Sequence, residues 1–108
     1  MAAPRIVVRL PAQAKRGEVI EIRTLAGHQM ETGFRRTQNG ELIPRDIITR
    51  FVCTYNGEEI FRAELHPAIA ANPLLTFTTV ARESGTLEFR WSGDNGYAAS
   101  YTAKLTVT

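Results

Sequence analysis

Residues 85–107 read Gly-Thr-Leu-Glu-Phe-Arg-Trp-Ser-Gly-Asp-Asn-Gly-Tyr-Ala-Ala-Ser-Tyr-Thr-Ala-Lys-Leu-Thr-Val, and they show the clearest strand pattern in the sequence. Leu87, Phe89 and Trp91 alternate with charged residues, so a β-strand would place all three on one face. A second alternating segment, residues 98–107, follows after a glycine-containing turn. The pattern predicts an antiparallel hairpin with one buried face.

Similar short segments recur along the chain between turn residues, which is typical of an all-β protein. The predicted strands are Arg5–Leu10, Glu18–Leu25, Thr49–Tyr55, Glu58–Leu65, Leu74–Val80, Gly85–Ser92 and Ala98–Val107. A length of 108 residues fits one domain. We therefore expect one immunoglobulin-like antiparallel β-sandwich of about seven strands over residues 1–108.

The Asn56–Gly57 dipeptide predicts a two-residue type I′ turn, because both residues tolerate positive φ. This turn would fix the register of the flanking strands. The expected cross-strand pairs are Tyr55 with Glu58, Cys53 with Ile60, and Phe51 with Arg62.

Cys53 is the sole cysteine, so it cannot form an internal disulfide. In mid-strand it is expected to be a small buried hydrophobe. The alternative is a reactive thiol, which would need exposure and a nearby cation.

Charge and hydropathy exclude several classes of protein. The net charge is +2, from 13 basic and 11 acidic residues, and the basic residues are scattered. A nucleic-acid-binding protein would gather them on one face, so no nucleic-acid partner is expected. There is no run of about 18 apolar residues for a membrane span and no signal-peptide core of about 7–15. These features alone favour the cytoplasm.

The segment of residues 26–48 is longer than an ordinary connection. Loops of more than about 12–15 residues are usually functional or disordered. Asn39–Gly40 in its middle predicts a projecting hairpin, and its apolar residues, among them Met30 and Phe34, favour a binding excursion. The alternatives are a decorated connection, or a plug in which Met30 and Phe34 close the open end of the sandwich. A second link, residues 65–73, reads as a crossover between sheets.

Catalytic and metal motifs are scarce in the sequence. It contains no nucleophile elbow, phosphate loop, Cys-x-x-Cys pair or zinc-protease helix. The two histidines, His28 and His66, are expected to make ordinary loop hydrogen bonds. With Met30 and Cys53 they include the ligand types of a copper site, but the spacing is wrong for one. We expect no metal, no cofactor and no enzyme activity.

Five segments together resemble the SoxZ family of bacterial sulfur-oxidation (Sox) proteins. They are His28-Gln-Met-Glu-Thr-Gly-Phe34, Ile43-Pro-Arg-Asp-Ile-Ile48, Phe51-Val-Cys-Thr-Tyr-Asn-Gly57, Leu65-His-Pro-Ala-Ile-Ala-Ala-Asn-Pro73 and Glu83-Ser-Gly-Thr-Leu-Glu-Phe-Arg-Trp91. The resemblance covers nearly the whole chain in order and spacing. Gln29 departs from it, since the family commonly has proline there.

The resemblance implies a non-catalytic subunit that forms a heterodimer with SoxY, or a heterotetramer of two such pairs. SoxY carries sulfur intermediates of thiosulfate oxidation on a cysteine in its C-terminal arm. The implied role is to stabilise SoxY and help present that arm to the cytochrome SoxXA, the hydrolase SoxB and a sulfur dehydrogenase. The implied location is the periplasm, reached together with SoxY.

We expect partner contacts from the long segment and the second link. The candidate residues are His28, Met30, Glu31, Thr32, Phe34, Arg35 and His66. Two other functions remain open from the residues: a free-standing immunoglobulin-like binding module, and an enzyme with Cys53 as nucleophile.

Overall fold

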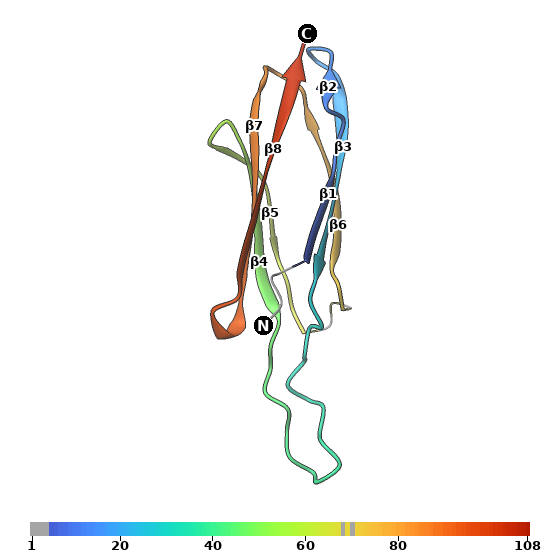
Figure 1. Ribbon diagram of the computed structural model, residues 1–108, viewed down its shortest axis with the longest axis vertical. Helices are drawn as coiled ribbons and strands as arrows, with labels where there is room; N and C mark the ends of the chain where they lie inside the picture. Colours follow the sequence, from blue (N-terminus) through green and yellow to red (C-terminus); the bar gives the residue numbers. More distant parts are fainter. Residues whose placement is uncertain (1–4, 68, 70) are drawn as a thin grey trace.

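The alternating segments form the strands of two facing sheets in the computed structural model, which describes residues 5–67, 69 and 71–108 (Figure 1). The strands are β1 (Arg5–Arg9), β2 (Gln13–Ala14), β3 (Val19–Gly27), β4 (Ile48–Tyr55), β5 (Glu58–Glu64), β6 (Leu74–Val80), β7 (Gly85–Gly93) and β8 (Ala98–Val107). A short 3₁₀ turn, η1 (Asp94–Gly96), joins β7 to β8. In the described part of the chain, no helix is long and apolar enough to cross a membrane.

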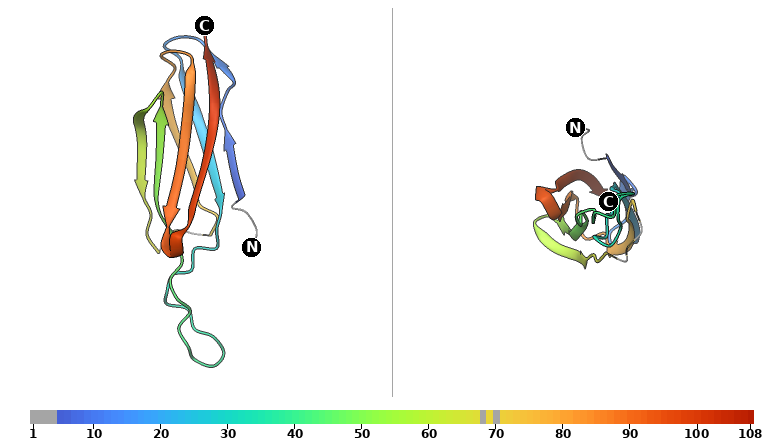
Figure 2. Two further views of the ribbon diagram at one scale, coloured as in Figure 1. Left: turned by 60° about the vertical axis from the view of Figure 1, so that its left-hand side comes forward. Right: turned by 90° about the horizontal axis from the view of Figure 1, so that it is seen from below.

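One sheet has the order β1-β3-β6 and the other the order β2-β8-β7-β4-β5. Neighbouring strands are antiparallel, except that β2 runs parallel to β8. In Figure 2, the left view shows the strands running along the length of the body, and the right view, seen from below, shows the two layers facing each other. The predicted immunoglobulin-like all-β sandwich is confirmed. The additional strand β2 was not predicted, because two residues are too few to show an alternating pattern.

The core lies between the sheets and is rich in aromatic rings. Leu87, Phe89 and Trp91 are all buried, which confirms the face predicted from their alternation. Phe61 of β5 stacks on Phe77 of β6, with ring centroids 4.3 Å apart. This stack joins the two sheets on the side where β5 and β6 are edge strands.

The β4–β5 hairpin has the predicted turn but not the predicted register. Asn56 and Gly57 have φ of 50° and 84°, as a type I′ turn requires. Tyr55 pairs with Glu58 as expected, but a bulge follows between Thr54 and Cys53. Because β5 has one extra residue there, the predicted Cys53–Ile60 and Phe51–Arg62 pairs are wrong. Cys53 lies opposite Phe61, and Phe51 lies opposite Ala63.

The link of residues 65–73 carries the chain from β5 in one sheet to β6 in the other, so the predicted crossover is confirmed. Ala68 and Ala70 in this link lie outside the described residues. The long segment between β3 and β4 extends beyond the end of the sandwich (Figure 1), and the molecule is 60 Å long but only 25 and 19 Å across.

Candidate functional site

Residues 28–47 form the projecting hairpin predicted between β3 and β4. Glu31 pairs with Asp46 through two backbone hydrogen bonds of 2.8 and 2.9 Å, and Arg36 bridges to Leu42 further out. The chain reverses around Gly40, whose φ is 83°. The Gly40 N–H donates to the Thr37 carbonyl at 3.0 Å. The segment is therefore an ordered two-armed projection.

The base of the hairpin is anchored on the η1 turn by Asp94. The Arg45 guanidinium donates to both Asp94 carboxylate oxygens, at 2.9 and 3.0 Å, and the Ile47 N–H donates to one of them at 3.1 Å. The hydrogen bond from Arg45 is the main reason that the pKa of Asp94 is lowered. The anchor is thus intact while Asp94 is ionised, and it weakens when the pH falls far enough to protonate this carboxylate.

His28 connects the hairpin base to the second link. Its Nδ1 accepts a hydrogen bond from the Met30 N–H at 2.9 Å, which leaves the proton of the neutral ring on Nε2. Nε2 lies 3.6 Å from an Asp46 carboxylate oxygen, and the ring packs edge-on against Tyr97. The backbone of His28 also exchanges two hydrogen bonds with Asn72. These contacts indicate that His28 has a structural role.

Met30 is buried in the base rather than presented to solvent. The residue is 4% exposed, and its sulfur accepts a hydrogen bond from the Ile48 N–H at 3.3 Å. The residue has a φ of 58°, in the left-handed region that residues other than glycine seldom adopt. For Met30 the structure favours the plug over the binding surface.

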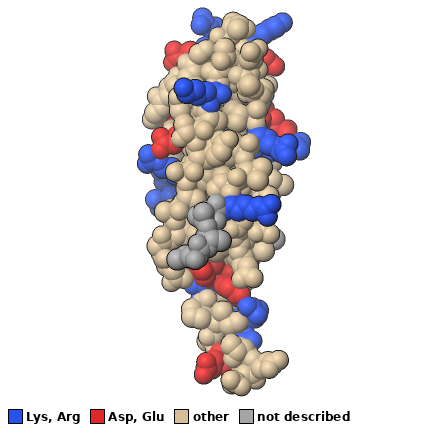
Figure 3. All heavy atoms as spheres, in the orientation of Figure 1, with Lys and Arg blue, Asp and Glu red and all other residues tan. Residues whose placement is uncertain are grey.

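The outer part of the hairpin presents a mixed apolar and charged surface. Phe34 is 81% exposed and Leu42 is 54% exposed. Arg35 donates from two nitrogens to the Glu31 carboxylate, which lowers the pKa of Glu31. Because the two charges offset each other, the tip is not strongly positive. Figure 3 shows acidic and basic side chains interspersed on the face in view, the projecting end included.

The seven candidate partner-binding residues therefore divide by location. His28 and Met30 are packed into the base, whereas Phe34 and Arg35 are exposed further out, with Glu31 and Thr32 partly exposed between them. His66 is exposed on the second link. That link is tied to the hairpin base through the hydrogen bonds of Asn72 to His28.

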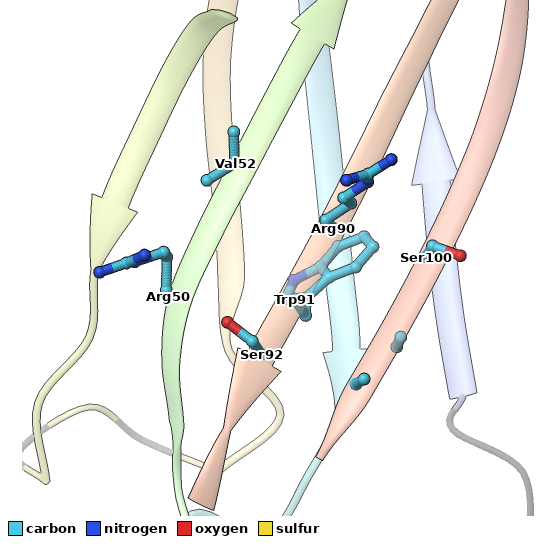
Figure 4. A pocket seen from close by; sticks show the side chains of 8 residues that line it. Arg50, Val52, Arg90, Trp91, Ser92 and Ser100 are labelled. Atoms are coloured by element: carbon cyan, nitrogen blue, oxygen red, sulfur yellow. The ribbon is translucent and has the colours of Figure 1, made fainter. Parts of the chain in front are cut away.

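An open hollow on the outer face of the five-stranded sheet was not predicted from the sequence. It has a volume of about 480 Å³ and is formed by neighbouring positions of β4, β7 and β8. Figure 4 shows Arg50, Val52, Arg90 and Ser100 around it. The alternation of β7 marks Arg90 as outward-facing, but the pairing of Arg90 with Val52 depends on a contact between distant strands. Each arginine already has a carboxylate partner on its own sheet, so the hollow has little net charge.

Cys53 is fully buried opposite Phe61 and Phe89. Burial raises the pKa of its thiol to about 12, so the thiolate is scarce at neutral pH. The prediction that Cys53 is buried is confirmed. Among the residues that the structure describes, no group of three or more His, Cys, Asp or Glu side chains is placed to hold a metal ion.

Cys53→Ser is expected to lower the free energy of unfolding by about 1–3 kcal/mol, because it buries a hydroxyl among aromatic rings. Cys53→Ala, which adds no polar group, should cost less. Urea titration of both variants measures the difference. The native thiol should react with a thiol reagent only after unfolding. Rapid labelling of the folded protein would contradict the burial of Cys53.

Fold and site together define an immunoglobulin-like module with an anchored projecting hairpin. A model of the family described as "Sulphur oxidation protein SoxZ" matches residues 8–104. The chain belongs to the SoxZ family. No curated protein sequence matches it.

Several solved structures share the fold. A superoxide reductase (neelaredoxin) from Ignicoccus hospitalis has a TM-score of 0.71 and 18% identity, over 99% of this chain and 81% of that one. A putative superoxide reductase from Thermotoga maritima has a TM-score of 0.72 and 18% identity, over 95% and 85%. The sulfur carrier protein SoxY from Chlorobium limicola f. thiosulfatophilum has a TM-score of 0.67 and 10% identity, over 95% and 78%. At these identities the likeness concerns the fold alone.

Proposed function

We propose that this chain is the non-catalytic subunit of a sulfur-carrier complex, in which it binds a SoxY-type protein. It stabilises that partner and helps present the sulfur intermediates bound to the partner's cysteine during thiosulfate oxidation. The observation that carries this proposal is the SoxZ family match over residues 8–104. The fold also resembles that of the sulfur carrier SoxY, so the proposed subunit and its SoxY-type partner would have similar shapes.

A non-catalytic role is supported by the chemistry of the described side chains. The Cys53 thiol is buried with a raised pKa, so it is a poor nucleophile. The Nδ1 atom of His28 is occupied by a backbone N–H, which removes its acceptor for a substrate proton. In this proposal the reacting cysteine belongs to the SoxY-type partner.

The projecting hairpin is proposed as the surface that meets the enzymes acting on the carrier. These are SoxXA, SoxB and a sulfur dehydrogenase, and the site of action is the periplasm, which the chain would reach together with its SoxY-type partner. Phe34 and Leu42 offer exposed apolar area on an anchored support. A small surface of this kind suits brief encounters, since permanent interfaces are usually much larger.

The double variant Phe34→Ala with Leu42→Ala is expected to leave the fold and the complex with SoxY intact while slowing turnover by the partner enzymes about tenfold. Loss of one or two exposed anchors typically costs enough binding energy for such a change. Co-expression and co-purification with SoxY measure complex formation, and sulfate release from thiosulfate by the reconstituted enzymes measures turnover. Thr102→Ala, at an exposed position of β8 on the sandwich body, is the control.

The two parts of the proposal fail separately. If the wild-type chain does not co-purify with SoxY, the carrier-subunit function is wrong. If the complex forms and the double variant turns over at the wild-type rate, only the role of the hairpin is wrong.

A further inference from the structure

Strand β6 is an edge strand without the usual protection against pairing. Sheet edges expose backbone N–H and C=O groups, and proteins generally protect them with charges, bulges or short strands. Among the described strands, β1 has Arg5 and Arg9, β2 has two residues, and β5 combines a bulge with charged side chains. β6 is seven residues long, Leu-Leu-Thr-Phe-Thr-Thr-Val, and has no charged residue. Its free edge is open to another strand.

The sequence of β6 is complementary to itself when it is read in the opposite direction. In an antiparallel pair centred on Phe77, Leu74 of one copy lies opposite Val80 of the other, and Thr76 lies opposite Thr78. These four residues are all exposed, on the outer side of the sheet. Apolar therefore meets apolar, and threonine meets threonine, which are favourable cross-strand pairs.

The neighbouring strands extend this match. Within one chain Val7 pairs with Leu25, Leu25 pairs with Leu74, and Val19 pairs with Val80. The same antiparallel pairing would therefore line up Val7, Leu25 and Leu74 of one copy with Val80 and Val19 of the other in one continuous apolar row. Two such rows form, related by the two-fold axis. They use four of the eight large apolar side chains that are exposed in the described part of the chain.

The charged positions also fit. Arg23 pairs with Thr76 and Glu21 pairs with Thr78 in the β3–β6 ladder. On β1, Arg9 pairs with Arg23. In the antiparallel pair, the row of Arg9, Arg23 and Thr76 of one copy therefore continues with Thr78 and Glu21 of the other. Opposite charges thus lie at the two ends of each central row, and no like charges face each other across the junction.

We infer that β6 pairs antiparallel with β6 of a second copy of this chain, about a two-fold axis at Phe77. The two three-stranded sheets then form one continuous sheet. This inference goes beyond the proposed function and does not depend on it. The other conceivable occupant of the edge is a strand of the SoxY-type partner, and the experiments below separate the two.

Cysteine cross-linking tests the register. Directly opposed residues in a ladder are within disulfide range, whereas diagonal positions are about 7–8 Å apart. When Thr76→Cys and Thr78→Cys chains are mixed under mild oxidation, in the presence of SoxY, a mixed covalent dimer is expected. Each variant alone should give little dimer. Native Cys53 does not interfere, because it is buried. Equal dimer in each single-variant sample, or cross-linking to a cysteine introduced in SoxY instead, would overturn the inference.

Thr78→Lys tests the energetics while preserving the fold. The new lysine lies beside Glu21 on β3, so it is compatible with the monomer. In the dimer the two lysines lie diagonally across the axis and repel each other. Sedimentation of the full chain up to about 1 mM should show that wild type dimerises and that Thr78→Lys raises the dimer Kd at least about tenfold. Thr102→Lys, an exposed position on β8, should behave like wild type. A wild-type chain that stays monomeric over this range, or an equal effect of the two lysines, would count against β6 pairing.

Discussion

Replacing Phe51 with alanine is expected to lower the free energy of unfolding by about 3–5 kcal/mol. Phe51 is fully buried, and its ring centroid lies between 4.9 and 6.3 Å from those of Phe61, Phe77, Phe89 and Trp91. These rings come from both sheets, so the cavity would open between the layers. Small domains are stable by only about 5–15 kcal/mol, and a large part of that margin would be lost.

Urea unfolding at equilibrium measures this loss. Phe51→Leu is the control, because it keeps most of the apolar volume and should cost clearly less. A cost below about 1 kcal/mol for Phe51→Ala would mean that the surrounding rings collapse into the space.

Met30→Ala is expected to be the second large loss, about 2–5 kcal/mol, because it empties a buried position at the hairpin base. It also removes the sulfur that accepts the Ile48 N–H. Met30→Leu restores the volume but not the acceptor, so it should recover most of the stability. Thermal unfolding of both variants, with and without SoxY, provides the measurement.

The result of Met30→Ala distinguishes packing from presentation. If the variant is as stable as wild type but the complex with SoxY turns over slowly, Met30 acts at an interface, and the plug assigned to it is wrong. If stability falls and Met30→Leu rescues both stability and turnover, the residue supports the hairpin from within.

Local patterns in the sequence predict the strands well. Leu87, Phe89 and Trp91 alternate cleanly, and a period of two leaves only one way to bury all three. Asn56–Gly57 likewise predicts its turn, because few dipeptides tolerate two positive φ angles. Both features depend on residues that are adjacent in the chain.

The bulge beside Cys53 and the hidden position of Met30 could not be predicted in this way. A bulge depends on how the side chains of β5 fit under the opposite sheet, where Phe61 stacks on Phe77. Met30 is held in its buried position by hydrogen bonds to His28 and Ile48. His28 is in turn bonded to Asn72, and Ile48 is the first residue of β4. The contacts with Ile48 and Asn72 join residues that are far apart in sequence, so no local pattern indicates them.

Because the single tryptophan is buried, its fluorescence is an intrinsic probe of folding. Trp91 is 2% exposed and sits against Phe51 at the centre of the core. Its fluorescence emission should be blue-shifted in the native state and should move to longer wavelength when water reaches the indole. Every core variant can therefore be followed without an added dye, and a change at the hairpin tip, far from the indole, should leave the spectrum as it is.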